Sequence, residues 1–285
     1  MSILYIFIFI LGLVAGSFLN VVIYRLETEE KIVNDRSRCP KCKHVLSWLD
    51  LFPVFSFLLL KGKCRYCLKK ISWQYPLVEI GTGILFVLVA FYFPYFSFQL
   101  LSTKLFYLLL IISALIVVSV FDIRHYIIPD KIIFPAIAVS LVYNFVVDFV
   151  LNDYMRLDYV FSGNGLISVL FLLLFASQFF NTLVAAFSAF GFFLIIFLLT
   201  KGNGMGGGDV KLAFLMGLIL GWPLILLAVF LSFIFGSIFG LALIFAGKKK
   251  MKSMVPFGPF LVAGTFVSLF WGEIIIKWYF NLFIF

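Results

Sequence analysis

The sequence predicts an all-α, polytopic helical membrane protein, and two observations carry that prediction. Of the 285 residues, 64% are hydrophobic and only 12% are charged, and the mean hydropathy is +1.17. Soluble domains carry about 25% charged residues. Several apolar runs also reach the roughly 20 residues that a helix needs to cross the hydrocarbon core of a bilayer. The lipid bilayer is therefore the predicted environment of the chain.

Apolar peaks occur along the whole chain, at residues 3–24, 77–96, 101–121, 132–150, 164–180, 182–200, 210–222, 223–246 and 257–280. The first peak is too long for the apolar part of a cleaved signal and no basic region precedes it, so we interpret it as a retained span. If all nine peaks crossed from an N-terminus outside the cell, the glycine-rich segment at 202–208 and the lysines at 248–252 would both lie on the outer side of the membrane. Lysine-rich loops stay in the cytoplasm, so one peak before these segments should not cross. We therefore predict about eight transmembrane helices, with 164–180 re-entrant, interfacial or strongly tilted.

The lysines and arginines predict the orientation. Residues 25–75 hold 11 of the 22 basic residues, and short loops rich in lysine and arginine stay in the cytoplasm. This places the N-terminus outside. The formal net charge of +9 does not indicate nucleic-acid binding, because the basic residues lie in loops and not on an aromatic-bearing helix face. The predicted division is residues 1–24 as the first transmembrane helix, 25–76 as a cytoplasmic loop and 77–285 as a membrane domain.

Four cysteines in the loop predict a metal site. They occur as "CPKC" at 39–42 and "CRYC" at 64–67, and these are all the cysteines of the chain. Paired C-x2-C motifs place four thiolates around one tetrahedral ion, for which zinc is the default and iron the alternative. A redox pair or disulfides are the competing interpretation, and a cytoplasmic location argues against disulfides. We predict a closed, structural zinc site formed by Cys39, Cys42, Cys64 and Cys67.

Two aspartates lie at the ends of predicted spans on the same membrane face. Asp122 ends the third span in "FDIRHYIIPD", and Asp209 follows the glycines of "GNGMGGGDVKL". Ionisable groups within spans are costly and mark functional sites by default. Two carboxyls brought together share a proton, so one can activate water while the other polarises a peptide carbonyl. This pattern predicts an aspartyl peptidase with Asp122 and Asp209 as its catalytic residues.

The backbone around these aspartates is predicted to be irregular. Glycines have no Cβ, so the chain can take left-handed angles and approach a substrate backbone closely. Such backbone is tolerated at membrane depth where it lines a cavity. A proline pushes the preceding residue out of helical angles, so the chain should turn after the third span. The residues predicted to make backbone or substrate contacts are Gly206, Gly207, Gly208, Pro129 and Asp130.

Taken in order, these motifs resemble the type IV prepilin peptidases, a family of GxGD-type intramembrane aspartyl peptidases. The resemblance extends over nearly the whole chain. Its motifs are "GSFLNVVIYRL" (16–26), "LSWLDLFPVFSFLLLKGKCRYCLKKISWQYPLVE" (46–79), "FDIRHYIIPD" (121–130), "GGGDVKL" (206–212) and "PFGPFLVAG" (256–264). Two features depart from the family pattern, namely Glu27, where members usually have proline, and the additional apolar stretch at 164–180.

The resemblance implies an activity and a location. Family members cleave the short basic leader of prepilins and pseudopilins at the cytoplasmic face of the bacterial inner membrane. By this resemblance Asp122 and Asp209 carry the catalysis. Many members with a four-cysteine loop also methylate the new N-terminus using S-adenosylmethionine, and Glu79 is a candidate participant in that step. The sequence identifies neither the particular prepilins nor the oligomeric state.

Two other functions remain open at the level of sequence. A transporter could use the same carboxylates to carry protons or cations, and glycine-interrupted helices occur in transporters. That interpretation predicts symmetry between the halves of the chain, which the sequence does not show, and it leaves the cysteine loop unexplained. The other alternative is a non-catalytic assembly factor for a pilus machine, against which the intact aspartates and glycines count.

Overall fold

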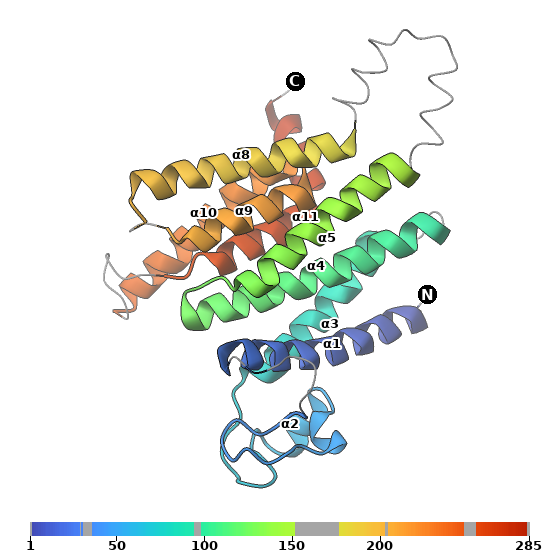
Figure 1. Ribbon diagram of the computed structural model, residues 1–285, viewed down its shortest axis with the longest axis vertical. Coiled ribbons are helices and arrows are strands. Elements are labelled where there is room, and N and C mark those ends of the chain that lie inside the picture. Colours follow the sequence, from blue (N-terminus) through green and yellow to red (C-terminus); the bar gives the residue numbers. More distant parts are fainter. Residues whose placement is uncertain are drawn as a thin grey trace. The chain divides into compact units, whose positions relative to one another are not determined.

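The computed structural model describes residues 2–28, 30, 36–93, 98–151, 177–202, 205–247 and 255–283. Within these ranges the chain forms helices and no strand, apart from two isolated antiparallel bridges. The predicted all-α class is confirmed. The chain divides into two compact units, Met1–Val120 and Phe121–Phe285, so each unit is described by itself (Figure 1). The α4 helix, Phe98–His125, begins in the first unit and ends in the second.

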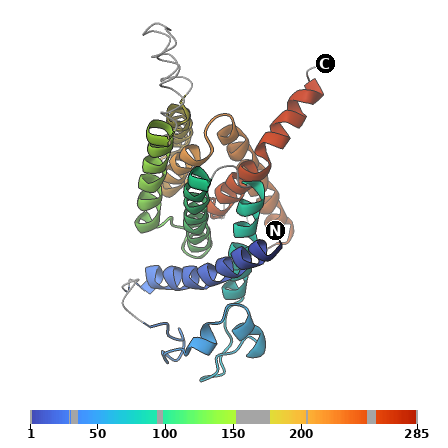
Figure 2. The same cartoon turned by 90° about the vertical axis from the view of Figure 1, so that its right-hand side faces the viewer.

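The first unit is built on two crossing helices, α1 (Ser2–Thr28) and α3 (Gln74–Tyr92). The loop between them contains a 3-10 helix, η1 (Trp48–Leu51), and a short helix, α2 (Phe55–Leu59). Figure 2 shows the loop gathered on one side of the crossing pair. The helices approach closely, since a Cβ on Gly16 would lie 2.7 Å from the Cα of Glu79. Small residues allow such contact in membranes, where helices associate through packing rather than through the hydrophobic effect.

The second unit places one short helix among longer ones. Its elements are α5 (Asp130–Val146), the π-helical turn η2 (Val147–Leu151), α8 (Gln178–Leu199), α9 (Gly207–Leu220), α10 (Leu224–Phe245) and α11 (Gly258–Phe283). The short α9 contacts α5, α8, α10 and α11, and nine of its 14 residues are buried. Gly217 of α9 lies directly against the backbone of Ala186 in α8. The core of this unit therefore surrounds α9.

Seven helices of the described chain are long and apolar enough to cross a membrane, and the protein is a multi-pass membrane protein. They match seven of the eight predicted spans. The eighth, at 210–222, corresponds to α9, whose 14 residues span about 21 Å against a hydrocarbon core of about 30 Å. Its crossing stays a prediction. Of the peak at 164–180, residues 178–180 form the first turn of α8; most of the rest, and the lysines at 248–252, lie outside the described residues.

Candidate functional site

The four cysteines form one cluster in the loop of the first unit. Their sulfur atoms all lie within 4.8 Å of one another, and all four thiols are free. Around a zinc ion with Zn–S distances of about 2.3 Å, tetrahedral sulfur atoms lie about 3.8 Å apart, so the cluster fits such an ion. The prediction that these cysteines come together at a site able to hold a metal ion is confirmed.

Each pair of cysteines sits in a knuckle, and the second knuckle repeats the first 25 positions later. The N–H of Cys39 donates to the carbonyl of His44 (2.9 Å). Correspondingly, the N–H of Cys64 donates to the carbonyl of Lys69 (3.0 Å). Two further pairs of hydrogen bonds are equivalent. Lys43 N–H donates to the Cys39 carbonyl, as Leu68 N–H does to the Cys64 carbonyl (both 2.9 Å). Leu46 N–H donates to the Ser37 carbonyl, as Ile71 N–H does to the Gly62 carbonyl (both 2.8 Å). Even the left-handed residues correspond, Lys43 (φ 59°) and Leu68 (φ 55°).

The knuckle backbone favours a thiolate in the first pair. Burial opposes ionisation of Cys39, but the N–H groups of Cys42 and Lys41 donate to its sulfur and lower its pKa to about 7. The N–H of His44 donates to Cys42 and favours its thiolate, yet partial desolvation and contacts with the sulfur atoms of Cys39 and Cys67 raise the pKa of Cys42 to about 11. A bound cation removes this conflict, because metal binding deprotonates its cysteine ligands. The donor set therefore fits a metal better than it fits four unliganded thiols.

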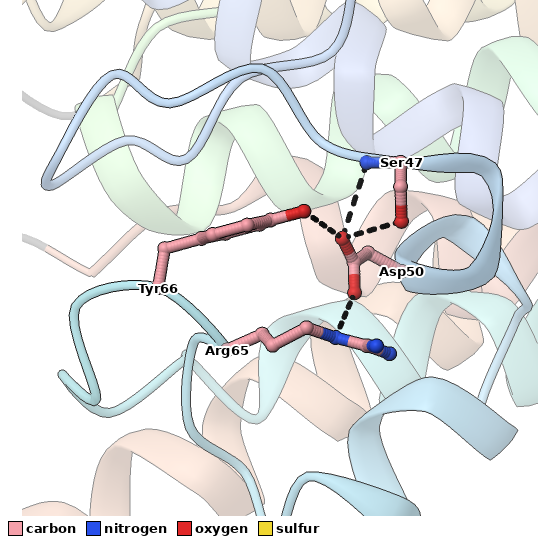
Figure 3. Close-up of polar contacts among 4 residues, drawn as sticks. All are labelled: Ser47, Asp50, Arg65 and Tyr66. Atoms are coloured by element: carbon pink, nitrogen blue, oxygen red, sulfur yellow. Dashed lines mark hydrogen bonds and ion pairs between the residues drawn. The ribbon is translucent and has the colours of Figure 1, made fainter.

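A second cluster, centred on Asp50, ties the loop together (Figure 3). One carboxylate oxygen accepts hydrogen bonds from the N–H (3.1 Å) and hydroxyl (2.9 Å) of Ser47 and from the Tyr66 hydroxyl (3.2 Å). The other oxygen pairs with Arg65 Nε at 2.9 Å. Burial opposes ionisation of Asp50, but these bonds and the Arg65 charge hold its pKa below the ordinary value. The Tyr66 ring also contacts that of His44, with centroids 3.7 Å apart and the ring planes tilted by 34°, which links the two knuckles.

Asp122 lies near the end of α4, in the second unit, and is 4% exposed. Its Oδ2 accepts a hydrogen bond from the N–H of Gly258, the first residue of α11, at 3.0 Å. A Cβ on Gly258 would lie 2.7 Å from that oxygen, so only glycine allows the approach. Gly258 lies within the "PFGPFLVAG" motif, but nothing in the local sequence predicts its contact with Asp122.

Asp209 is the third residue of α9 and is 7% exposed. Its Oδ2 accepts a hydrogen bond from the N–H of Gly206, the residue before the helix, at 3.2 Å. The carboxyl of Asp122 acts electrostatically on that of Asp209. The two predicted carboxyls thus lie within electrostatic range of each other, one near the end of α4 and the other at the start of α9.

The glycines beside Asp209 differ from the prediction of left-handed backbone. Gly206 is extended (φ −75°), and Gly207 and Gly208 are the first two residues of α9. The left-handed angle falls earlier, at Gly202 (φ 76°). Gly208 is needed for packing instead, since a Cβ there would lie 2.8 Å from the Cβ of Ile128. Gly207 and Gly208 adopt helical rather than left-handed angles because a helix that starts here buries the apolar residues of α9 that follow.

The turn predicted at Pro129 is confirmed. The α4 helix ends at His125, Tyr126 takes a left-handed angle (φ 58°), and Pro129 is the residue before α5. Asp130, the first residue of α5, lies at the surface and pairs with Lys211 of α9, with 2.6 Å between Nζ and Oδ1. This pair joins the segment after Asp122 to the helix that carries Asp209.

The helices and the site define a class, a multi-pass membrane protein with a buried carboxyl pair in one unit and a four-cysteine loop in the other. Two family models match the chain, the Bacterial Peptidase A24 N-terminal domain over residues 10–93 and the Type IV leader peptidase family over residues 152–241. The first match contains the four cysteines, and the second contains Asp209. Asp122 lies between the matched segments, so the family models do not cover it. Its assignment to the site is supported by its contact with Gly258 and its electrostatic interaction with Asp209.

Similar proteins over nearly the full length are named "Prepilin leader peptidase/N-methyltransferase". The protein of that name from Bacillus subtilis (strain 168) is 32% identical over 96% of this chain and 97% of its own length. Those from Aeromonas salmonicida (strain A449) and Pseudomonas aeruginosa are 32% and 30% identical, over 95% of this chain and 92% and 91% of their own lengths. No solved structure matches the chain significantly. The chain belongs to the type IV leader peptidase family.

Proposed function

We propose that this protein is a membrane aspartyl endopeptidase that removes the basic leader of prepilins and pseudopilins and then methylates the new N-terminus. The observation that carries the peptidase part is the buried pair of Asp122 and Asp209, each fixed by a glycine N–H. The names of the full-length relatives support the substrate and both activities. Asp122 and Asp209 are the proposed catalytic residues.

The pair supports hydrolysis without any further group. The ionised carboxylate accepts a proton from a water molecule as the water oxygen attacks the peptide carbonyl carbon. The protonated carboxyl donates its proton to the carbonyl oxygen and so stabilises the tetrahedral intermediate. Collapse of that intermediate breaks the C–N bond. The departing amine takes a proton from the first carboxyl, and the second, now ionised, carboxylate takes a proton from a hydroxyl of the intermediate, which restores the starting pair. The glycine N–H bonds hold both carboxyls in position through these steps.

The proposed location is the bacterial inner membrane, with the N-terminus outside and residues 25–76 in the cytoplasm. The basic residues of the loop support this orientation. In this arrangement residues 77–285 form the catalytic membrane domain, and the cut falls at the cytoplasmic membrane face. Gly206, Gly207, Gly208, Pro129 and Asp130 are proposed to shape the backbone at which the substrate is bound.

The loop is proposed to hold a structural zinc ion and to serve the second activity. Four sulfur ligands close the coordination sphere, so the ion orders the knuckles and takes no part in the chemistry. S-adenosylmethionine, when bound, supplies the methyl group that is transferred to the new N-terminal amine. The relatives' name supports this activity. The two activities are thus proposed to depend on different parts of the chain.

Co-expression with a model prepilin, followed by intact-mass spectrometry, tests the proposal. The parent protein is expected to give a pilin that lacks its leader and carries one additional methyl group. Asp122→Asn and Asp209→Asn keep the side-chain volume but cannot share a proton, and each is expected to abolish cleavage. Glu273→Gln is the matched control, because Glu273 is an exposed carboxylate of the same unit that pairs with the exposed Lys277 at 3.7 Å.

Membrane insertion of each variant is measured alongside by the yield of folded protein in detergent. Cleavage by either aspartate variant at near the parent rate would show that the shared-proton mechanism is wrong. Absence of cleavage by the parent with several prepilins would favour the transporter or assembly-factor interpretations instead.

A further inference from the structure

Residues 48–59, called here the apolar segment, form an exposed apolar surface outside every span. Seven of the twelve residues are large, apolar and exposed, with Trp48 at 70%, Phe55 at 65% and Leu59 at 80%. Only Phe57 of α2 is buried, where its ring packs edge-on against Trp73 at a centroid distance of 5.1 Å. Apolar residues on the spans face lipid tails, but the apolar segment lies in a loop. Its exposure requires an occupant.

A hydrogen bond fixes the position of the apolar segment along the axis of the α3 helix, and so its depth relative to the membrane. The N–H of Val54 donates to Oε2 of Glu79 at 2.7 Å. Glu79 is buried and is the sixth residue of α3, so it lies about 7.5 Å inside the start of a helix that is long and apolar enough to cross the membrane. Val54 has a positive φ (62°), which is rare for a β-branched residue, at the position where its N–H meets this carboxylate.

The α1 helix gives the same depth from the other side. Ser17 hydrogen-bonds to Glu79, and Gly16 packs on its Cα, so the level of Val54 corresponds to residues 16–17 of α1. Beyond that level α1 continues for three turns, and its residues stay mostly apolar up to Tyr24. Lys43 of the first knuckle reaches the Tyr24 hydroxyl at 2.8 Å. The first knuckle therefore contacts the last apolar turn of α1.

The charge of the loop indicates what covers the segment. Residues 36–73 carry nine basic side chains against a single acidic one, Asp50, whose charge is paired with Arg65. Lys61 and Lys63 directly follow the segment and are exposed, as are Lys69 and Lys70. Aromatic and aliphatic side chains beside lysines are typical of segments that lie in the headgroup layer of an anionic membrane.

We propose that the apolar segment is an interfacial anchor that inserts Trp48, Phe52, Phe55, Leu58 and Leu59 into the headgroup layer of an anionic lipid leaflet. The basic residues of the knuckles contact the phosphates above it, and the metal cluster is thereby held at the membrane surface. The depth of Val54, the exposure of the segment and the charge of the loop all support a lipid occupant. A prepilin segment or a second copy of the chain are the other occupants that the test must distinguish.

The experiment uses the full chain in nanodiscs of phosphatidylcholine, with and without phosphatidylglycerol. Subtracting the emission of Trp48→Phe from that of the parent isolates Trp48 among the five tryptophans. With phosphatidylglycerol present, this difference emission is expected to lie at short wavelength and to lose most of its intensity when the acyl chains carry bromine. Replacing Lys69 and Lys70 by glutamine is expected to weaken the dependence on phosphatidylglycerol.

A paired change tests the apolar contact itself. Leu58→Asp with Leu59→Asp is expected to shift Trp48 emission to long wavelength and to remove the bromine quenching. Leu58→Met with Leu59→Met is the matched control and should retain both signals. Both positions are exposed, so neither pair of changes removes a buried side chain. Trp48 emission that is water-like and unquenched in both lipid mixtures would overturn the proposal. So would protection of Trp48 that arises only on adding a prepilin or on raising the protein concentration.

Discussion

The four-cysteine loop and the aspartate site are assembled in opposite ways. The loop builds its cluster from two copies of one knuckle, in which each hydrogen bond joins residues no more than nine positions apart. The aspartate site joins the end of α4 to the start of α9 and α11, and its Gly258–Asp122 bond spans 136 positions. A local motif suffices to place metal ligands, whereas a pair of buried carboxyls needs a whole helical core around it. The two regions should therefore respond independently to perturbation.

Metal removal gives the largest expected effect and should be confined to the loop. Structural zinc contributes apparent binding free energies of about 10–16 kcal/mol in small zinc domains, so a strong chelator should unfold the knuckles. Limited proteolysis is expected to cut within residues 36–73 while the second unit stays resistant. A variant with all four cysteines changed to serine should be cut there with or without chelator. Proteolysis of both units to the same extent after metal removal would show that the loop and the aspartate site do not respond independently.

Gly258→Ala is expected to damage the aspartate site and leave the loop intact. The new Cβ would lie 2.7 Å from Asp122 Oδ2, so the carboxyl must move. Displacements of about 1 Å can lower catalytic rates about 100-fold, and we expect a loss of that size in kcat for leader cleavage. Gly240→Ala is the control, because nothing lies within 4 Å of a Cβ at that position. Equal kcat values for the two variants would show that the Gly258 contact does not position Asp122.

Asp50→Asn should weaken the loop by about 1–2 kcal/mol, since it replaces a charge-assisted contact by neutral ones. Because the folded-state pKa of Asp50 is lowered, this stabilisation is present above about pH 4 and is lost as the pH falls. At neutral pH the variant is expected to release its metal to a competing chelator faster than the parent does. Lys41→Gln, which removes a charge from an exposed position of the first knuckle, should release its metal at the parent rate. Equal release rates for Asp50→Asn and the parent would contradict the role of the Asp50 cluster.

The smallest effect is expected from the exposed pair of Lys211 and Asp130. Surface ion pairs contribute about 0–1 kcal/mol, so Lys211→Gln should change stability and cleavage little. If Asp130 contacts the substrate as proposed, Asp130→Asn should raise KM several-fold with little change in kcat. Steady-state kinetics on both variants separates the two roles. If Lys211→Gln and Asp130→Asn both change KM only slightly, Asp130 serves as an ion-pair partner of Lys211 and does not contact the substrate.

The sequence predicted what is encoded locally. The C-x2-C spacing indicated the metal cluster, and the 25-position repeat of the cysteines could also have indicated that both knuckles share one backbone. Pro129 correctly marked the turn after α4. The apolar peaks located seven long helices because span length and hydropathy depend only on neighbouring residues.

Contacts between distant segments could not be predicted in this way. Nothing near Gly258 in the sequence shows that its N–H meets Asp122, and nothing near Glu79 shows that it binds Val54. The glycines before Asp209 suggested unusual backbone angles, but Gly208 is required by the side chain of Ile128. In each case the reason for the residue lies on another element of the fold.

The shortness of α9 has a consequence for how the protein is made. A helix of 14 residues offers the insertion machinery too little apolar length to be retained in lipid by itself. If α9 crosses as predicted, its retention must come from neighbouring helices, and α8, which precedes it in the chain, lies directly against its backbone at Gly217 and Ala186. We expect α8 and α9 to enter the membrane as one hairpin. The helix that carries Asp209 would then reach its position only during biogenesis of the complete second unit, so that no shorter nascent fragment contains a working carboxyl pair.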